Sequence, residues 1–254
     1  MDLLNSTIDT QLRHRTIRQF TGDPLPDDVF RTLMDVAQRT ASSRGMQHAS
    51  IIRVVDAQLR SVLADVGHQA YMGQAPEMLV FIVDTHRNQV ILDERGAAGY
   101  GARSMDSFFE GWTDACLMAQ NIVVAAESLG LGTNYFGNVL NSPSRVIELL
   151  RLPALTFPVV GLTLGYPAQD PQLKPRMPMS LRVMTNGYTE PPSVVDALRD
   201  YDAVMQTYYD LREHGRRSDT FTDQVVSKLN AVLPERHHIV QAIRSQGWDL
   251  ALAD

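Results

Sequence analysis

The stretch SFFEGWTDACLMAQNIVVAAESLGLG, residues 107–132, carries the strongest secondary-structure signal in the chain. Apolar residues cover most of the circumference of a helix of about seven turns, and Gly130 and Gly132 stand where it ends. A helix with so few polar positions must lie deep in a core or pack against a partner subunit.

Shorter strands and helices alternate on both sides of this helix. β-branched and apolar runs predict strands, whereas capping residues followed by apolar residues at helical spacing predict helices. The predicted strands are SIIRVVD (50–56), EMLVFIVDT (77–85), TNYFGNV (133–139) and TFPVVGLTLGYP (156–167). The predicted helices are LPDDVFRTLMDVAQRT (25–40), DAQLRSVLADVG (56–67), SPSRVIELL (142–150) and two within residues 193–233. The pattern predicts one globular sandwich of the α+β or α/β class.

The composition excludes several classes of function. With 254 residues the chain can bury a full core, and its net charge of −6 argues against general attraction to nucleic acid or an anionic membrane. The sequence shows no signal-peptide pattern and no apolar run long enough to span a bilayer.

The single cysteine, Cys116, excludes an internal disulfide, and its apolar setting predicts an inert core thiol. We expect a cytoplasmic protein without a metal site, since the adjacent His237 and His238 cannot chelate one ion.

Positive charge gathers in RHRTIRQF at residues 13–20, although the chain is acidic overall. If residues 5–20 begin as a helix and turn into extended chain near Phe20, Arg15 and Arg18 share one helix face and can converge on one phosphate. The alternative is a solvated basic helix end, because cations also suit helix C-termini.

A second cationic cluster, LKPRMP at residues 173–178, holds Lys174 and Arg176 on a loop stiffened by prolines. Such a loop loses little entropy when it positions its charges, which favours a preorganised anion site. The alternative is a surface loop with two ordinary charges. Neither cluster has the spacing of a P-loop or of a dinucleotide-binding fingerprint.

Several motifs together resemble the NADPH-dependent, FMN-containing nitroreductase family, in its flavin reductase and oxygen-insensitive nitroreductase branch. The resemblance covers almost the whole chain in the family's order. The motifs that carry it are HRTIRQFTGDPLP (14–26), ASSRGMQHASIIRVVD (41–56), AAESLGLGTNYFGNVLNSPSRVIELLRLP (125–153), FPVVGLTLGYPAQDPQLKPRMP (157–178) and YYDLREHGRRSDTFTD (208–223).

The resemblance implies a fold and an assembly. The expected fold is an α+β, nitroreductase-like three-layer sandwich with a central, mostly antiparallel sheet flanked by helices and a helical excursion near the C-terminus. Residues 1–254 would form a single FMN-binding domain, with residues 193–254 as a C-terminal helical extension. The chain would act as a homodimer whose flavin sites lie at the subunit interface.

The resemblance also implies the cofactor-binding residues. The first basic motif and the Lys-Pro-Arg motif would meet across the fold to hold the FMN phosphate through His14, Arg15, Thr16, Arg18, Lys174 and Arg176. Ser42 and Ser43 would reach the ribityl chain or the phosphate, and Gln69 and Tyr71 would approach the isoalloxazine edge. The turn after Tyr135 would bring the backbone of Phe136, Gly137 and Asn138 to the flavin. Arg212 would meet the 2′-phosphate of NADPH, with Arg216 and Arg217 close enough to help.

Three positions depart from the family pattern. Asn138 stands where a second glycine is common, and Leu140 replaces an arginine that many members carry. Gly45 falls where a bulkier side chain is frequent, which would widen the pocket over the flavin. Leu140 bears on how the nicotinamide cofactor or an acidic substrate is held.

The function implied is hydride transfer from NADPH to bound FMN, followed by two-electron transfer to a flat acceptor such as a nitroaromatic, a quinone or free flavin, in a ping-pong cycle. The reaction would be centred on the flavin, without an obligatory catalytic side chain, and Gln69 would tune the ring by hydrogen bonding. The alternative function is an FMN-binding storage or redox-sensing protein with little turnover. The expected partners are a small-molecule acceptor and a second copy of the chain, with no nucleic acid and no membrane.

Overall fold

The computed structural model describes residues 4–213, 219–230 and 233–249. The chain divides into two compact units, Met1–Pro171 with Glu235–Asp254, and Gln172–Pro234. The first unit contains the β-sheet and the long apolar helix, and the second is built from helices and loops. The predicted single domain over residues 1–254 with an extension over residues 193–254 stays a prediction.

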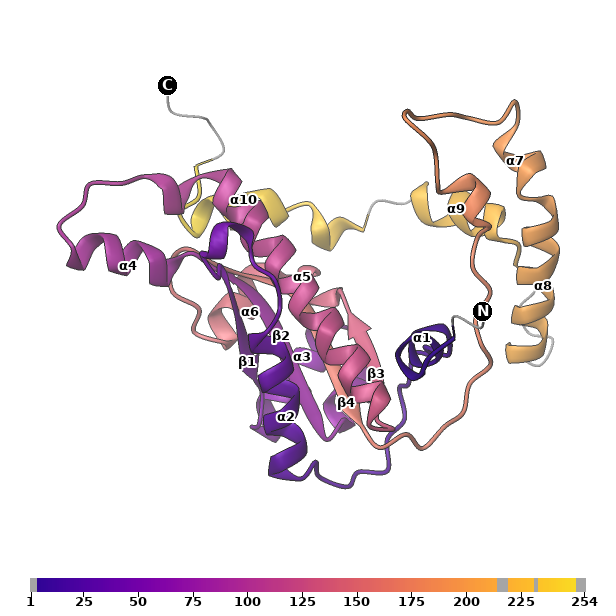
Figure 1. Cartoon of the computed structure of the whole chain (residues 1–254), viewed down its shortest axis with the longest axis horizontal. Coiled ribbons are helices and arrows are strands. Elements are labelled where there is room, and N and C mark those ends of the chain that lie inside the picture. The colour runs from indigo at the N-terminus through magenta and orange to yellow at the C-terminus, as the bar shows by residue number, and fades with distance from the viewer. Residues whose placement is uncertain (1–3, 214–218, 231–232, 250–254) are drawn as a thin grey trace. The chain divides into compact units, whose positions relative to one another are not determined.

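The first unit is organised around a four-stranded antiparallel sheet in the order β1-β2-β4-β3 (Figure 1). Its strands are β1 (Ala49–Arg53), β2 (Glu77–Asp84), β3 (Gly132–Phe136) and β4 (Thr156–Gly165). β2 and β4 lie within predicted strands, whereas β1 and β3 each begin one residue before the predicted strand. The β2–β4 register shifts between Phe81 and Ile82, next to Pro158. A proline lacks the N–H that a regular ladder needs, so an irregularity is expected there.

Strand β2 shows why the sheet is covered on both faces. Its side chains are buried at successive positions, and the period of two sends them alternately to opposite faces. Leu79, Phe81 and Val83 join the apolar cluster of α2 (Asp27–Gln38) and α5 (Met105–Ser128). Met78, Val80 and Ile82 join the cluster of α3 (Ala57–Val66) and α6 (Pro143–Leu149).

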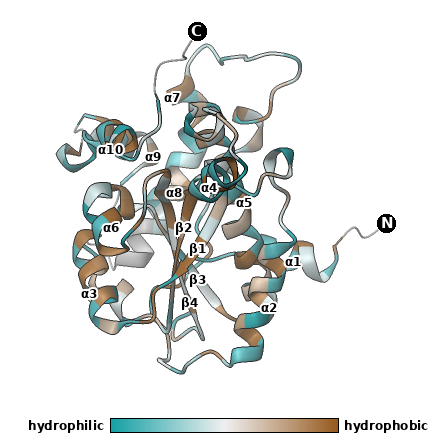
Figure 2. Cartoon of the chain, turned by 90° about the vertical axis from the view of Figure 1, so that its left-hand side faces the viewer, coloured by the Kyte–Doolittle hydropathy of each residue, from teal (hydrophilic) through white to brown (hydrophobic). Residues whose placement is uncertain are grey.

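Figure 2 shows the apolar strands between α3 and α6 on one side and α2 on the other. The helix layers and the sheet confirm the predicted α+β three-layer sandwich.

Helix α5 is the helix that the apolar stretch predicted. Ser104 caps it, because its hydroxyl accepts a hydrogen bond from the Ser107 N–H at 3.1 Å. Gly130, with φ at +79°, takes the left-handed conformation just beyond its end. One face is fully buried in the core, where Ala115, Ala119, Ile122, Val123 and Ala126 pack.

The opposite face of α5 leaves apolar side chains at the surface. Phe109 is 61% exposed and Leu117 is 45% exposed. Cys116 lies on this face and is also exposed, so the expectation of a core thiol is wrong. Its apolar neighbours still remove enough water to raise the pKa of the Cys116 thiol, which disfavours the reactive thiolate.

Gly111 sets how closely α5 approaches the strands. A Cβ at this position would lie 2.5 Å from the carbonyl oxygen of His48 and 2.7 Å from Val83 Cγ1. Glycine in a helix interior costs about 1 kcal/mol relative to alanine. The cost is tolerated here because any side chain would push α5 away from the sheet.

The remaining helices of the first unit include two that the sequence analysis missed, α4 (His86–Glu94) and α10 (Ile239–Ser245). α4 is mainly polar and buries no residue, so its apolar pattern is weak. α3 is capped at its start by Asp56, whose side chain accepts from the Leu59 N–H at 2.7 Å, and at its end by Gly67, as predicted. Along the described segments, no helix combines the length and apolar character that crossing a bilayer requires.

The N-terminal helix is shorter than expected. α1 spans Ser6–Leu12 and is capped by Asn5, whose side chain accepts from the Ile8 N–H at 3.0 Å. Arg15 and Arg18 therefore do not lie on one helix face, and that expectation is wrong. The chain leaves the helix because Ile17 is buried beside β3, where its backbone N–H donates to the carbonyl oxygen of Thr133 at 2.8 Å.

The second unit contains α7 (Val194–Ala197), α8 (Arg199–Glu213) and α9 (Phe221–Leu229). Asp202 of α8 accepts hydrogen bonds from the backbone and hydroxyl of Thr222, at 3.0 and 2.6 Å, which fixes the start of α9. The aromatic rings of Tyr201 and Phe221 pack with centroids 5.4 Å apart. Residues 172–178 form an extended loop, as their prolines predicted.

Gly161 of β4 faces Phe136 of β3, and a Cβ at Gly161 would lie 1.9 Å from the Phe136 ring. Substitution of Gly161 by alanine should therefore displace this ring and lower stability by about 1–3 kcal/mol. Thermal unfolding of the purified protein should show a melting temperature several degrees below that of the wild type. Gly101→Ala is the matched control, because a Cβ at Gly101 meets no atom within 4 Å. Equal melting temperatures for the two variants would contradict the packing described.

Candidate functional site

The basic stretch at residues 13–20 runs beside the edge strand β3 instead of forming a helix. Thr16 forms a parallel β-bridge with Thr133, and Ile17 fills the space over Gly132, where a Cβ would lie 2.7 Å from its side chain. Phe20 forms a second bridge with Pro167, beyond the end of β4. The backbone contacts fix this segment, so its side chains project from an anchored chain.

Two arginines of the segment have different surroundings. Arg15 pairs with Asp170, and its Nε is buried without a hydrogen-bond partner among the described residues. Arg18 is exposed, and its guanidinium carbon lies 5.9 Å from the centre of the Tyr71 ring. At this distance the contact is a cation–π interaction that orients the guanidinium.

His14 is held by a carboxylate from α5. Its Nδ1 lies 2.7 Å from Glu127 Oε1, and the same oxygen accepts a hydrogen bond from the Thr133 hydroxyl at 2.7 Å. The imidazole is about one-third exposed, whereas the Glu127 side chain is 13% exposed. The contact connects the start of the basic segment to both α5 and β3.

The loop after α3 brings Gln69 and Tyr71 together. Gln69 is exposed and precedes the short 3₁₀ helix η2 (Ala70–Gln74), and its side-chain oxygen accepts a hydrogen bond from the Tyr71 hydroxyl. Through the ring of Tyr71, this pair adjoins Arg18. The structure therefore places three of the predicted site residues in one group.

The turn after β3 combines a buried ring, an open glycine and a buried amide. Phe136 is buried, and a Cβ at Gly137 would meet no atom within 4 Å. Asn138 opens the 3₁₀ helix η4 (Asn138–Leu140), and its Nδ2 donates to the Gly67 carbonyl oxygen at 2.7 Å. Asn138 thus does what a second glycine could not: its side chain ties the turn to the end of α3.

Ser42 and Ser43 lie on a different part of the first unit, in the loop of residues 42–48 that leads into β1. Two carboxylates of α5 hold this loop. The Ser43 N–H donates to Asp114 Oδ1 at 2.9 Å and its hydroxyl donates to Glu110 Oε1 at 3.0 Å. Arg44 donates two hydrogen bonds of 2.7 Å to Glu110.

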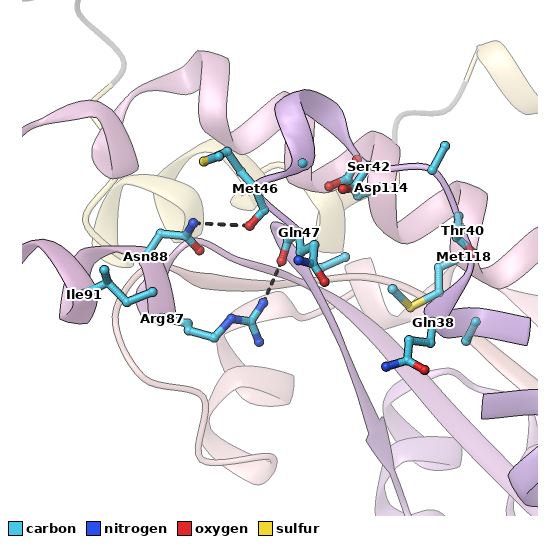
Figure 3. A pocket seen from close by; sticks show the side chains of 14 residues that line it. Gln38, Thr40, Ser42, Met46, Gln47, Arg87, Asn88, Ile91, Asp114 and Met118 are labelled. Carbon is cyan, nitrogen blue, oxygen red and sulfur yellow. Dashed lines mark hydrogen bonds between the residues drawn. The ribbon is translucent and has the colours of Figure 1, made fainter. Parts of the chain in front are cut away.

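The same loop has a strained backbone, and hydrogen bonds from side chains of α4 support it. Arg44 and Gln47 take left-handed conformations, with φ at 48° and 55°, as does Gly45 with φ at 70°. From α4, Arg87 donates to the carbonyl oxygen of Gln47 at 2.6 Å, and Asn88 donates to that of Met46 at 3.2 Å (Figure 3). Side-chain hydrogen bonds thus keep the loop in a conformation that non-glycine residues disfavour.

This loop lines a pocket of about 600 Å³ (Figure 3). Thr40, Ser42, Gly45, Met46, Arg87, Asp114 and Met118 are among the residues around it. A second hollow of about 400 Å³ shares Ser42 and Asp114 with it and extends to Phe109 and Leu117 on the exposed face of α5. The predicted serines therefore face open space next to an apolar surface.

Hydrogen bonds and burial shift the pKa values of two side chains near this loop. The hydrogen bonds that Arg44 donates are the main cause that keeps the pKa of Glu110 below its usual value. His48 is buried, so desolvation lowers the pKa of its ring, although the nearby Glu110 opposes that shift. Its Nδ1 lies 3.5 Å from Glu110 Oε2 and is buried without a hydrogen bond among the described residues.

The second unit carries the other predicted phosphate ligands. Arg176 donates to the carbonyl oxygen of Lys174 at 2.8 Å, and the Tyr201 hydroxyl donates to that of Pro175 at 3.4 Å. The expected meeting of this motif with the first basic motif stays a prediction. The backbone of Arg212 lies in α8 and its side chain lies outside the described part, whereas Arg216 and Arg217 are outside the described residues altogether.

The first unit thus holds two groups of predicted site residues. His14, Thr16 and Arg18 lie with Gln69 and Tyr71 near β3 and η2, and Ser42 and Ser43 lie at the start of β1. Over the described ranges, no hydrogen bond or ion pair connects the serines to the first group. Clusters of three or more His, Cys, Asp or Glu side chains arranged for a metal ion do not occur in the described ranges.

Four residues that support these groups were not predicted from the sequence. Three are the carboxylates Glu110, Asp114 and Glu127, and the fourth is Arg236, which donates to the Gly137 carbonyl oxygen at 3.2 Å. A signal was available for the first three. Acidic residues on a helix that is apolar over most of its circumference need partners, because burying an unpaired carboxylate is unfavourable.

Profiles of one protein family match most of this chain. The profile described as "Nitroreductase family" matches residues 12–166, and that described as "Nitroreductase family, C-terminal domain" matches residues 174–251. The chain is 38% identical over 245 residues to an NADPH-flavin oxidoreductase of Vibrio harveyi, covering 96% of this chain and 98% of the relative.

A second relative and a solved structure support the same family. An oxygen-insensitive NADPH nitroreductase of Salmonella typhimurium is 37% identical, with 96% of this chain and 99% of the relative covered. The solved structure of NfrA2 from B. megaterium superimposes with a TM-score of 0.91 at 32% identity, over 98% of this chain and 100% of that one. By sequence over nearly its full length and by fold, the chain belongs to the nitroreductase family.

Proposed function

We propose that this chain is an FMN-dependent oxidoreductase that takes electrons from NADPH. The observation that carries the proposal is the anchored basic segment: His14, Arg15, Thr16 and Arg18 project from a backbone that is bonded to β3. The family assignment and the relatives named NADPH-flavin oxidoreductase and NADPH nitroreductase support the same cofactors.

The residues present fit the flavin. A phosphate monoester prefers several charge-assisted donors, and His14, Arg15, Thr16 and Arg18 together offer two guanidinium groups, an imidazole and a hydroxyl. The buried Arg15 Nε has no hydrogen-bond partner within the described ranges, so those residues do not use all the donors of Arg15. The open space at Gly137 allows a flat ring to approach the backbone closely.

When bound, FMN supplies two-electron transfer from NADPH to a flat acceptor, a nitroaromatic, a quinone or free flavin, in a ping-pong cycle. Each protein residue has a binding role. His14, Arg15, Thr16 and Arg18, with Lys174 and Arg176, would hold the phosphate. Ser42 and Ser43 would bind the ribityl chain or the phosphate. Gln69, oriented by the Tyr71 hydroxyl, would hydrogen-bond the ring edge and tune it.

A homodimer accounts for the two separate groups of ligands. Glu110, which holds the serine loop, and Glu127, which holds His14, stand about 25 Å apart along the axis of α5. A two-fold axis that pairs α5 with its copy would bring the serine loop of one subunit toward the basic segment of the other. Burial of Phe109 and Leu117 on the exposed face of α5 would favour that pairing. The single cysteine suits the reducing cytoplasm as its compartment.

A flavin-storage or redox-sensing role remains the second candidate because of Leu140. This leucine is half-buried and packs against both apolar clusters, so it offers no charge to a nicotinamide cofactor. A phosphate site suits both functions, whereas reduction by a nicotinamide nucleotide requires the first.

The purified protein should show flavin absorption bands that bleach on anaerobic addition of NADPH and return when a quinone or a nitroaromatic is added. The physical reason is that hydride transfer removes the oxidised isoalloxazine chromophore and the acceptor restores it. Parallel additions of NADH provide the comparison. Bound flavin that neither nucleotide reduces would favour storage, and failure to bind added FMN would overturn the assignment of the basic segment.

Arg18→Ala and Lys174→Ala should each weaken FMN binding by about tenfold to a hundredfold, because each removes one charge-assisted partner of the phosphate. Fluorescence titration of the flavin-free protein measures the dissociation constant. Arg13→Ala is the matched control, since Arg13 is exposed, caps the C-terminal end of α1 and pairs with Asp9 of that helix at 2.9 Å. Unchanged FMN affinity in both test variants would exclude these residues as phosphate ligands.

Arg212→Ala should raise the KM for NADPH much more than the KM for NADH, because only NADPH carries the 2′-phosphate that Arg212 is proposed to bind. Steady-state kinetics with both nucleotides and one acceptor measure the effect. Arg199→Ala on the same helix is the control, as Arg199 pairs with Asp196 at 2.6 Å. Equal changes for the two nucleotides would refute the assignment.

A further inference from the structure

Glu127 occupies an electrostatically unfavourable place. It stands in the last turn of α5, where the helix dipole disfavours negative charge, and no basic residue occupies that turn. Its side chain is only 13% exposed, so water cannot fully solvate the carboxylate. A group in this position requires compensating partners.

The partners of Glu127 come from the basic segment and from β3, to which that segment is bonded. Its Oε1 is 2.7 Å from His14 Nδ1 and accepts from the Thr133 hydroxyl at 2.7 Å. The carbonyl oxygen of Thr133 in turn accepts from the Ile17 N–H at 2.8 Å. Glu127 therefore belongs to one hydrogen-bonded unit that connects α5, β3 and the basic segment.

This geometry decides which atom of His14 is available. An ionised carboxylate only accepts hydrogen bonds, so Nδ1 must carry the hydrogen in the contact. The other nitrogen, Nε2, has no hydrogen bond among the described residues and is not buried. A carboxylate bonded to one ring nitrogen fixes the orientation and tautomer of an imidazole, as it does for histidines that bind metals.

We propose that Glu127 is a positioning residue for the flavin phosphate, acting through His14. It holds the ring so that Nδ1 donates to the carboxylate and Nε2 faces the phosphate, to whose oxygen it donates when the ring is protonated. This inference rests on the proposed function, since it deepens the assignment of His14 as a phosphate ligand.

The first test compares ligands with and without a phosphate. In Glu127→Gln, the dissociation constant for FMN should rise about three- to tenfold, whereas that for riboflavin, which lacks the phosphate, should stay unchanged. Thr133→Val, which removes the second donor to Glu127, should produce a smaller loss in the same direction. Glu148→Gln is the matched control, because Glu148 forms an exposed pair with Arg145.

The second test asks whether the effect passes through His14. In a double-mutant cycle, Glu127→Gln should cause no further loss of FMN affinity once His14 is replaced by glutamine. Long-range proton–nitrogen NMR of the flavin-free protein, at a pH where the ring is neutral, should show the Nδ1–H tautomer in the wild type and a shift toward Nε2–H in Glu127→Gln.

Three results would overturn the inference: equal weakening of FMN and riboflavin, additive losses in the cycle, or an unchanged tautomer in Glu127→Gln. Failure of the wild type itself to bind FMN would overturn the proposed function together with this inference. Normal wild-type binding with additive losses would overturn this inference alone. Thermal unfolding of each variant establishes that it is folded. If Glu127→Gln does not fold, the dissociation constants of Thr133→Val for FMN and riboflavin test the inference instead.

Discussion

The packing of α5 against one face of the sheet is the interaction on which the rest of the structure depends. Its small and β-branched residues close the core from one side, and Gly111 brings the helix into contact with the backbone of His48. The same helix then carries Glu110, Asp114 and Glu127 to the two groups of predicted flavin ligands. One element thus supplies both the apolar burial that stabilises the fold and the carboxylates that orient the site.

The sequence predicted those features whose causes are local. Strand β2 was recognisable because it is apolar at nearly every position, and α3 because Asp56 and Gly67 mark its two ends. The family motifs located the candidate ligands. Helix α4 escaped prediction because it buries no residue and shows little apolar pattern.

Other features depend on contacts between distant segments, which no local pattern reports. Residues 13–20 leave the helical conformation because Ile17 is buried against β3, so the expected helix face of Arg15 and Arg18 does not form. The partners His14 and Glu127 are 113 residues apart in the chain. The exposure of Cys116 was also not predictable from its neighbours in sequence, which are apolar, because its side of α5 is exposed in a single chain.

The alternation of β2 between two buried faces separates the source of stability from the surfaces that bind small molecules. Most candidate ligands lie in peripheral segments that side-chain hydrogen bonds hold in place, whereas the stabilising contacts lie inside the sandwich, where Phe136 is the candidate ligand that belongs to a core cluster. Natural proteins are only slightly more stable than their function requires. Few substitutions are therefore tolerated at binding residues that also form the core. Here substitutions among the peripheral candidate ligands leave the contacts inside the sandwich intact, so the interior retains the stability that keeps intermediate sequences folded.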